Sequence, residues 1–125
     1  MAFRKESLGR EYHNQDVICR QGEVGDRMFV LQTGRAVVIL EDEGKETVID
    51  TLEKGDIFGE MAIFDKQTRS ATIRVEGRAR ILTLDKRTFL KRVHEDPSLA
   101  FQVLKKMSLR IRSLHQQIDA LNRQE

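Results

Sequence analysis

An acidic residue and a basic residue flank a polar loop in the stretch Phe58–Ile73, which reads FGEMAIFDKQTRSATI. Gly59 and Glu60 precede what we interpret as a short helix, and the free N–H groups at a helix start attract anions. Arg69 stands at the other end of the loop, and its planar guanidinium suits a phosphate. These residue types predict a compact site for one phosphate group.

The remaining polar groups of this stretch indicate what the phosphate would be attached to. The N–H groups of Met61 and Ala62 and the hydroxyl of Ser70 are expected donors to the phosphate. Ionised Glu60 only accepts hydrogen bonds, so it requires a hydroxyl donor close to the phosphate. A sugar hydroxyl meets that need, and we therefore expect a phosphorylated sugar held between the acid and the base.

A plainer interpretation of the same residues is a structural ion pair between Glu60 and Arg69 across the loop. Surface ion pairs are common and contribute little to stability. Residue types alone favour this alternative. The order and spacing of the neighbouring residues are what favour a binding site.

The chain has 125 residues, which suits a single domain spanning residues 1–125. All eight glycines fall between Gly9 and Gly77, and the only proline is Pro97. The first two-thirds therefore read as turn-rich, and the last third as uninterrupted helix. The net charge of +2 gives no general attraction to nucleic acid or to a membrane.

Short apolar runs bounded by turn residues recur through the first part of the chain. Many short strands at close spacing predict a mainly β fold, an antiparallel β-roll or jelly roll over about residues 11–85, with flanking helices. EDEGKE is expected to be a hairpin tip, and QTGR and EGRA are expected to be connections. The predicted strands are Asp16–Arg20, Met28–Gln32, Ala36–Glu41, Thr47–Leu52, Ala71–Val75 and Ala79–Leu84.

Residues 86–125 predict two helices. Asp85 is the expected cap of KRTFLKRVHE, and Asp96 caps a second helix with Pro97 at its first position. Apolar residues of the last helix alternate at spacings of four and three, which predicts a heptad seam and a homodimer. The alternative is one amphipathic helix packed on its own roll. We expect its first turns, with Phe101, to be buried. The seam residues are Ala100, Leu104, Met107, Ile111, Leu114, Ile118 and Leu121.

FGEMAIFDKQTRSATI resembles the phosphate-binding cassette of cyclic-nucleotide-binding domains, and bacterial catabolite-activator-like sensor domains in particular. GEVGDRMFVLQTG, residues Gly22–Gly34, resembles the strand pair that precedes the cassette, and LEKGDIFGE resembles its lead-in. The likeness covers most of the chain from about Asp16 onward. It implies a β-roll flanked by helices, as the strand and helix patterns independently predict.

The resemblance implies roles for the residues that match the cassette. Glu60 would accept the ribose 2′-hydroxyl, and Arg69 would pair with the exocyclic oxygens of the cyclic phosphate. Ser70 would contact the phosphate and allow a guanine base. The cassette departs from the pattern at Thr68, where proline is frequent, so we expect a slightly looser loop. The residues that would line the pocket are Gly59, Met61, Ala62 and Ala71.

The base contacts are less defined. Where bacterial activators of this family place a Thr-Ser pair on the long helix, this chain has Leu114 and His115. We hypothesise that Arg110 contacts the base. The resemblance therefore implies either cAMP or cGMP as the ligand.

Other classes of function find little support. The histidines lack ligand spacing, so no metal is expected, and no catalytic arrangement indicates an enzyme. Cys19 lies in an apolar run as a small hydrophobe, and a cytoplasmic protein without membrane or nucleic-acid contacts is expected. The prediction is a regulatory sensor that transmits cyclic-nucleotide binding through its C-terminal helix. The alternatives are a dimerisation module with a vestigial pocket, or the sensor half of a transcription regulator.

Overall fold

A computed structural model of the chain describes residues 9–64 and 67–123. The chain divides into two compact units, residues 1–89 and 90–125, and each is described by itself. The first unit contains all of the described strands and a short helix, α1 (Met61–Phe64). The predicted single domain over residues 1–125 stays a prediction.

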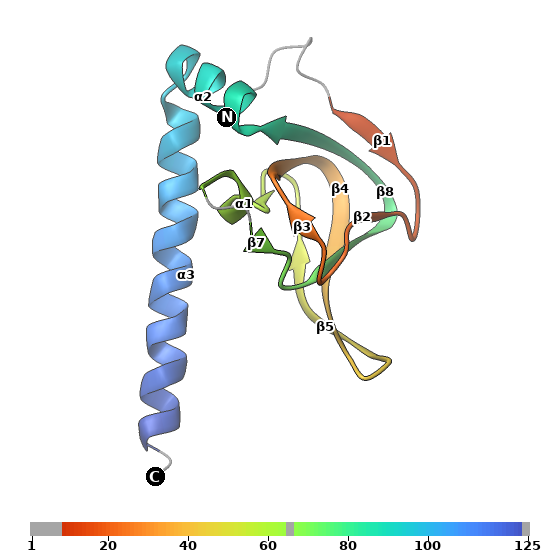
Figure 1. Cartoon of the computed structure of the whole chain (residues 1–125), viewed down its shortest axis with the longest axis vertical. Helices are drawn as coiled ribbons and strands as arrows, with labels where there is room; N and C mark the ends of the chain where they lie inside the picture. The colour runs from red at the N-terminus through yellow and green to blue at the C-terminus, as the bar shows by residue number, and fades with distance from the viewer. Residues whose placement is uncertain (1–8, 65–66, 124–125) are drawn as a thin grey trace. The chain divides into compact units, whose positions relative to one another are not determined.

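The first unit is built on two long antiparallel strands, β4 (Arg27–Asp42) and β8 (Thr72–Asp85), which pair along most of their length (Figure 1). They form the centre of a six-stranded sheet with the order β1-β8-β4-β5, to which β2 and β6 add short pairings. This mostly antiparallel roll with helices confirms the predicted fold class. The shorter strands are β1 (Arg10–Tyr12), β2 (Val17–Cys19), β5 (Lys45–Leu52) and β6 (Ile57–Phe58).

The predicted connections QTGR and EGRA are not turns, and this part of the prediction is wrong. Met28–Gln32 and Ala36–Glu41 both belong to β4, and Ala71–Val75 and Ala79–Leu84 merge into β8 except for Ala71. Gly34 (φ +90°) and Gly77 (φ +79°) bend the strands at register shifts instead of ending them. A glycine inside a β pattern therefore marked a bulge here, not a loop.

Three very short strands were not predicted by the sequence patterns. β3 (Val24–Gly25) and β7 (Gln67–Thr68) form a separate two-stranded sheet, with Val24 opposite Thr68. β6 pairs with β4 at Phe29 and Val30. Two residues are too few to show an alternation, but these pairings fix the segments around the predicted site.

Apolar side chains from β4 and β8 make the core. Met28, Leu31, Ile39, Ile81 and Leu84 are almost fully buried, each stabilising the fold by roughly 1.5–3 kcal/mol relative to exposure. Cys19 packs against this core, as the apolar run predicted. Burial raises the pKa of the Cys19 thiol, an effect that the charge of Arg69 partly offsets.

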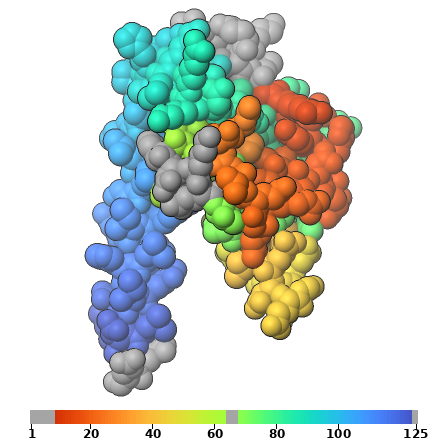
Figure 2. Space-filling model, in the orientation of Figure 1, coloured from red at the N-terminus to blue at the C-terminus, as the bar shows by residue number. Residues whose placement is uncertain are grey.

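The predicted hairpin tip at EDEGKE is present between β4 and β5, where Asp42 pairs with Lys45. Glu43 (φ 51°) and Gly44 (φ 80°) occupy its two central positions, both left-handed as in a type I′ turn. The tip, yellow in Figure 2, stands out from the rest of the roll.

The helices after the roll begin where the sequence predicted, within one residue. α2 covers Lys86–Glu95, and the Thr88 N–H donates to Asp85 Oδ1 at 2.7 Å, so Asp85 is its cap. α3 covers Ser98–Arg123, and the Ser98 N–H donates to Asp96 Oδ1 at 3.1 Å. None of the helices within the described ranges has the length and hydrophobicity of a membrane span.

α3 carries both buried and exposed apolar residues. Leu99 and Val103 are buried, whereas Phe101 is 66% exposed within the single chain, so its expected burial, against the roll and a partner helix together, stays a prediction. Phe101 lies off the seam, so a heptad pattern could not settle its environment. Five seam residues are exposed along the helix, namely Leu104, Ile111, Leu114, Ile118 and Leu121.

The Asp85 cap yields a pH-dependent prediction. Hydrogen bonds from the Thr88 N–H, and then from its hydroxyl, hold the pKa of the Asp85 carboxyl below its ordinary value. The cap therefore stabilises the fold above the ordinary pKa and loses that effect as pH falls through the lowered pKa. We expect Asp85→Ala to lower the denaturation temperature at pH 7 and much less at pH 2, measured by circular dichroism.

Asp85→Asn is the matched control, because asparagine caps a helix without titrating. It should keep most of the stability at pH 7. An equal loss in the Ala and Asn variants at pH 7 would contradict a capping role.

Candidate functional site

The first part of the site is the turn from β6 into α1. Gly59 follows β6 with a φ of +73°, a backbone conformation that favours glycine. The Ala62 N–H donates to the Gly59 carbonyl at 3.2 Å, and the Ile63 N–H donates to the Glu60 carbonyl at 3.1 Å. The Ala62 N–H thus already has a partner within this tight turn, and its contact with a phosphate stays a prediction.

The backbone of Arg69 is held from both sides by a distant loop. The Gly22 N–H donates to the Arg69 carbonyl at 2.9 Å, and the Arg69 N–H donates to the Glu23 carbonyl at 2.7 Å. The β3–β7 pair continues this contact at Thr68 and Gln67. The backbone of Arg69 is thus held in place by hydrogen bonds within the chain itself.

The side chain of Arg69 lies in a niche made of glycine, aromatic and backbone groups. Nη2 donates to the Arg27 carbonyl at 2.8 Å, and the guanidinium carbon lies 5.4 Å from the centre of the Phe29 ring. Phe29 in turn stacks on Phe58 with ring centres 5.1 Å apart.

Two glycines make room for this guanidinium. A Cβ placed on Gly59 would lie 2.7 Å from Arg69 Nη1, and one placed on Gly25 would collide with Arg69 Nε. The structure therefore brings the predicted base beside Gly59, next in sequence to the predicted acid. The segments around Gly25, Gly59 and Arg69, which are far apart in the sequence, thus meet at this guanidinium.

Glu60 is 1% exposed, although it is a charged residue in a loop region. Burial of a carboxylate is costly and is uncommon outside functional or structural polar sites. A residue this buried does not form an exposed surface ion pair, and the alternative of a structural pair with Arg69 stays an interpretation of the sequence.

The other predicted residues differ in exposure. Met61 and Ser70 are exposed, Ala71 is partly exposed, and Ala62 is buried. Thr68, the departure from the family pattern, is held opposite Val24. Arg110 lies on α3 in the second unit with an exposed side chain, and its base contact stays a prediction.

Sequence reasoning missed the residues that hold Arg69. Gly25, Arg27 and Phe29 act on it from a segment about 40 positions earlier, and the hydrogen bond to Arg27 spans 42 positions. The glycine spacing in GEVGDR was the available signal. It marked a turn-rich segment, but the pattern alone does not say which distant side chain a glycine accommodates.

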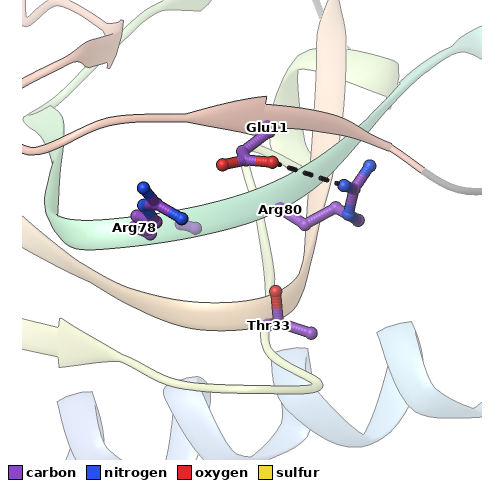
Figure 3. A pocket seen from close by; sticks show the side chains of 5 residues that line it. Glu11, Thr33, Arg78 and Arg80 are labelled. Atoms are coloured by element: carbon purple, nitrogen blue, oxygen red, sulfur yellow. Dashed lines mark ion pairs between the residues drawn. The ribbon is translucent and has the colours of Figure 1, made fainter.

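A surface depression lies elsewhere on the roll, lined by Glu11, Thr33, Arg78, Ala79 and Arg80 (Figure 3). Glu11 and Arg80 form an ion pair across it at 3.6 Å. None of the predicted site residues lines it. Within residues 9–64 and 67–123, no three His, Cys, Asp or Glu side chains are arranged to hold a metal ion.

Residues 9–96 match the family model described as the cyclic nucleotide-binding domain, and this chain belongs to that family. The match includes the whole roll and the segment from β6 to β8.

The relatives place the domain in several contexts. The cAMP-dependent protein kinase regulatory subunit of Blastocladiella emersonii is 40% identical over 81 residues, which cover 64% of this chain and 20% of that protein. Thermus thermophilus catabolite activator protein is 25% identical, with a TM-score of 0.80, over 94% of this chain and 56% of that one. The cAMP-bound form of the EAL enzyme Bd1971 is 30% identical, with a TM-score of 0.62, over 91% and 31%. This chain thus spans only about a fifth to a half of these longer proteins.

The niche predicts different outcomes for two glycine substitutions. Gly59→Ala and Gly77→Ala both place alanine at a left-handed φ, which costs about 1–2 kcal/mol. A Cβ on Gly77 meets no atom within 4 Å, whereas one on Gly59 also crowds the Arg27 carbonyl and Phe29, both at 3.2 Å. We expect Gly59→Ala to lower the free energy of unfolding more than Gly77→Ala, measured by urea denaturation. Equal losses would show that Gly59 is not closely packed.

Proposed function

We propose that this chain binds a 3′,5′-cyclic nucleotide in the cassette from Gly59 to Ala71. Arg69 pairs with the exocyclic oxygens of the cyclic phosphate, and Glu60 accepts the ribose 2′-hydroxyl. Gly59, Met61, Ala62 and Ala71 line the pocket, and Ser70 adds a hydroxyl near the phosphate. Of the two expected backbone donors, the Ala62 N–H would exchange its hydrogen bond to the Gly59 carbonyl for one to the phosphate.

The observation that carries this proposal is the placement of the Arg69 guanidinium beside Gly59, where the Arg27 carbonyl and the Phe29 ring hold it. A guanidinium stacked on Phe29 has already lost much of its conformational freedom, so less entropy is lost when a phosphate binds. Its Nη1 faces Gly59, where backbone and ligand can approach closely because no Cβ intervenes.

The proposed ligand is either cAMP or cGMP. The Blastocladiella relative is described as cAMP-dependent, and the EAL enzyme Bd1971 has been solved in cAMP-bound and cGMP-bound forms. Ser70 is exposed and offers a hydroxyl to either ligand. We keep Arg110 as the proposed base contact.

The role that follows is regulatory, not catalytic. Binding would order the cassette, and the change would pass to the helices, where a partner or a further domain responds. The similar proteins differ in overall function: one is a protein kinase regulatory subunit and another is an EAL enzyme. A cytoplasmic location is part of the proposal.

Replacing Arg69 tests the site directly. We expect Arg69→Ala to weaken cAMP and cGMP binding by about 30-fold or more, because the phosphate loses its charged bidentate partner. Isothermal titration calorimetry measures the affinity, and urea denaturation checks that the variant is folded.

Arg78→Ala is the matched control, since Arg78 is an exposed arginine on β8 outside the cassette. It should bind like the wild type. Unchanged binding by Arg69→Ala would overturn the site assignment, and absence of binding by the wild type would favour the vestigial-pocket alternative.

We also propose that the exposed seam of α3 pairs with a second copy of the chain. Leu104, Ile111 and Ile118 alternate with Leu114 and Leu121 at heptad spacing, and all five are at least 50% exposed. Ile at one core position and Leu at the other favour a parallel two-stranded coiled coil. An apolar stripe of this length is rarely left in water by a soluble protein.

A pair of substitutions on α3 tests the dimer. Leu114→Glu places charge in the seam, whereas Leu109→Glu places it at an equally exposed leucine outside the seam. Sedimentation velocity should show a dimer for the wild type and Leu109→Glu, and a monomer for Leu114→Glu. A monomeric wild type, or equal effects of both changes, would contradict the proposed seam.

A further inference from the structure

A cluster of three polar residues, Gln21, Glu41 and Thr72, lies where the end of β4 meets the start of β8. The side-chain amide of Gln21 makes two hydrogen bonds to the backbone of Glu41, as a paired strand would. Its Nε2 donates to the Glu41 carbonyl at 2.9 Å, and its Oε1 accepts the Glu41 N–H at 2.7 Å. We call these three residues the polar bridge.

Thr72 completes the polar bridge from β8. Its hydroxyl accepts the Gln21 backbone N–H at 3.0 Å and donates to Glu41 Oε2 at 3.2 Å. Thr72 is 1% exposed, whereas Gln21 and Glu41 are partly exposed, so the buried end of both hydrogen bonds is the Thr72 hydroxyl, for which losing a partner is costly. The hydroxyl is therefore used in both of its roles at once.

The polar bridge is adjacent in sequence to the groups that hold Arg69. Gly22 and Glu23, which follow Gln21, make the two backbone hydrogen bonds to Arg69. Gly25, a little further along, packs against the guanidinium. On the other strand, Thr72 is close in sequence to Arg69. Both segments that meet at Arg69 are thus anchored at the same three residues.

We propose that the polar bridge positions Arg69 for the phosphate, so that Gln21, Glu41 and Thr72 are positioning residues for ligand binding. This inference rests on the proposed function. It also connects the β4–β5 hairpin to the phosphate affinity, because Glu41 lies in that hairpin opposite Glu46. Without the bridge, the Gly22–Glu23 loop loses the hydrogen bonds that Gln21 makes to Glu41 and Thr72, although the pairing of Cys19 with Ile73 remains. Its two backbone hydrogen bonds to Arg69 then open more often.

The matched substitutions are Thr72→Val, which removes the hydroxyl at nearly constant shape, and Thr72→Ser, which keeps it. The first measurement is amide hydrogen exchange of the ligand-free protein, followed by NMR. Thr72→Val should speed exchange at the Arg69 N–H about tenfold, because its bond to Glu23 opens more often. The Leu31 N–H, bonded to the Asp56 carbonyl at 2.9 Å, should not change. Thr72→Ser should leave both rates within about twofold of the wild type.

The second measurement is the affinity for cAMP and cGMP. Thr72→Val should weaken binding about tenfold, and Thr72→Ser should restore it to within about twofold. In an Arg69→Ala background, titrated with millimolar cAMP by NMR, the Val substitution should have almost no further effect. Such non-additivity is the signature of a residue that acts through Arg69.

The outcomes separate this inference from the proposed function. If the wild type binds neither nucleotide, the proposed function fails, and the exchange rates still decide whether the bridge holds Arg69. If exchange at Arg69 and Leu31 rises together, or if the Val substitution weakens binding equally in both backgrounds, the bridge is only a structural contact. If Thr72→Val does not fold, Gln21→Met removes the two side-chain bonds to Glu41 at similar length and takes its place in both experiments.

Discussion

The guanidinium of Arg69 occupies space that a Cβ atom on Gly25 or Gly59 would fill. The geometry of the proposed site depends on this steric constraint. Gly25 and Gly59 face the guanidinium, the Phe29 ring lies under it, and the Arg27 carbonyl accepts one of its hydrogen bonds. A side chain at either glycine would displace the charge from its place beside the turn into α1. The arginine is thus oriented by backbone and ring, while part of its fork still faces Gly59.

The long strands of the roll explain how such a niche forms from separate segments. β4 supplies Arg27 and Phe29 and pairs with β6, which delivers Phe58 and Gly59. β8 starts just after Arg69 and pairs with β4 over most of its length. The fold therefore acts as a frame on which a loop of the cassette is held at both ends. Binding and catalytic loops on rigid scaffolds commonly use this arrangement.

The sequence predicted the class of fold, the family and the helix caps, because each has a local signature. The strand runs, the FGE and RSAT segments, and Asp85 and Asp96 needed only neighbouring residues to be recognised. It did not predict that Gly34 and Gly77 bend continuous strands, because a glycine signals a bulge and a turn equally well. It also missed Gly25, Arg27 and the polar bridge, since contacts between residues far apart in the chain leave no periodic pattern. The burial of Glu60 could likewise not be predicted from its residue type, because glutamate is usually exposed.

The central claim is that the Arg69 guanidinium is the group that receives the cyclic phosphate. The most direct measurement is a titration of arginine side-chain N–H signals by NMR as cAMP or cGMP is added to the wild-type chain. The account predicts that the Nε–H signal of Arg69 shifts to saturation with the ligand, while that of Arg78 stays in place. Saturable binding of either nucleotide with no change at Arg69 would contradict it.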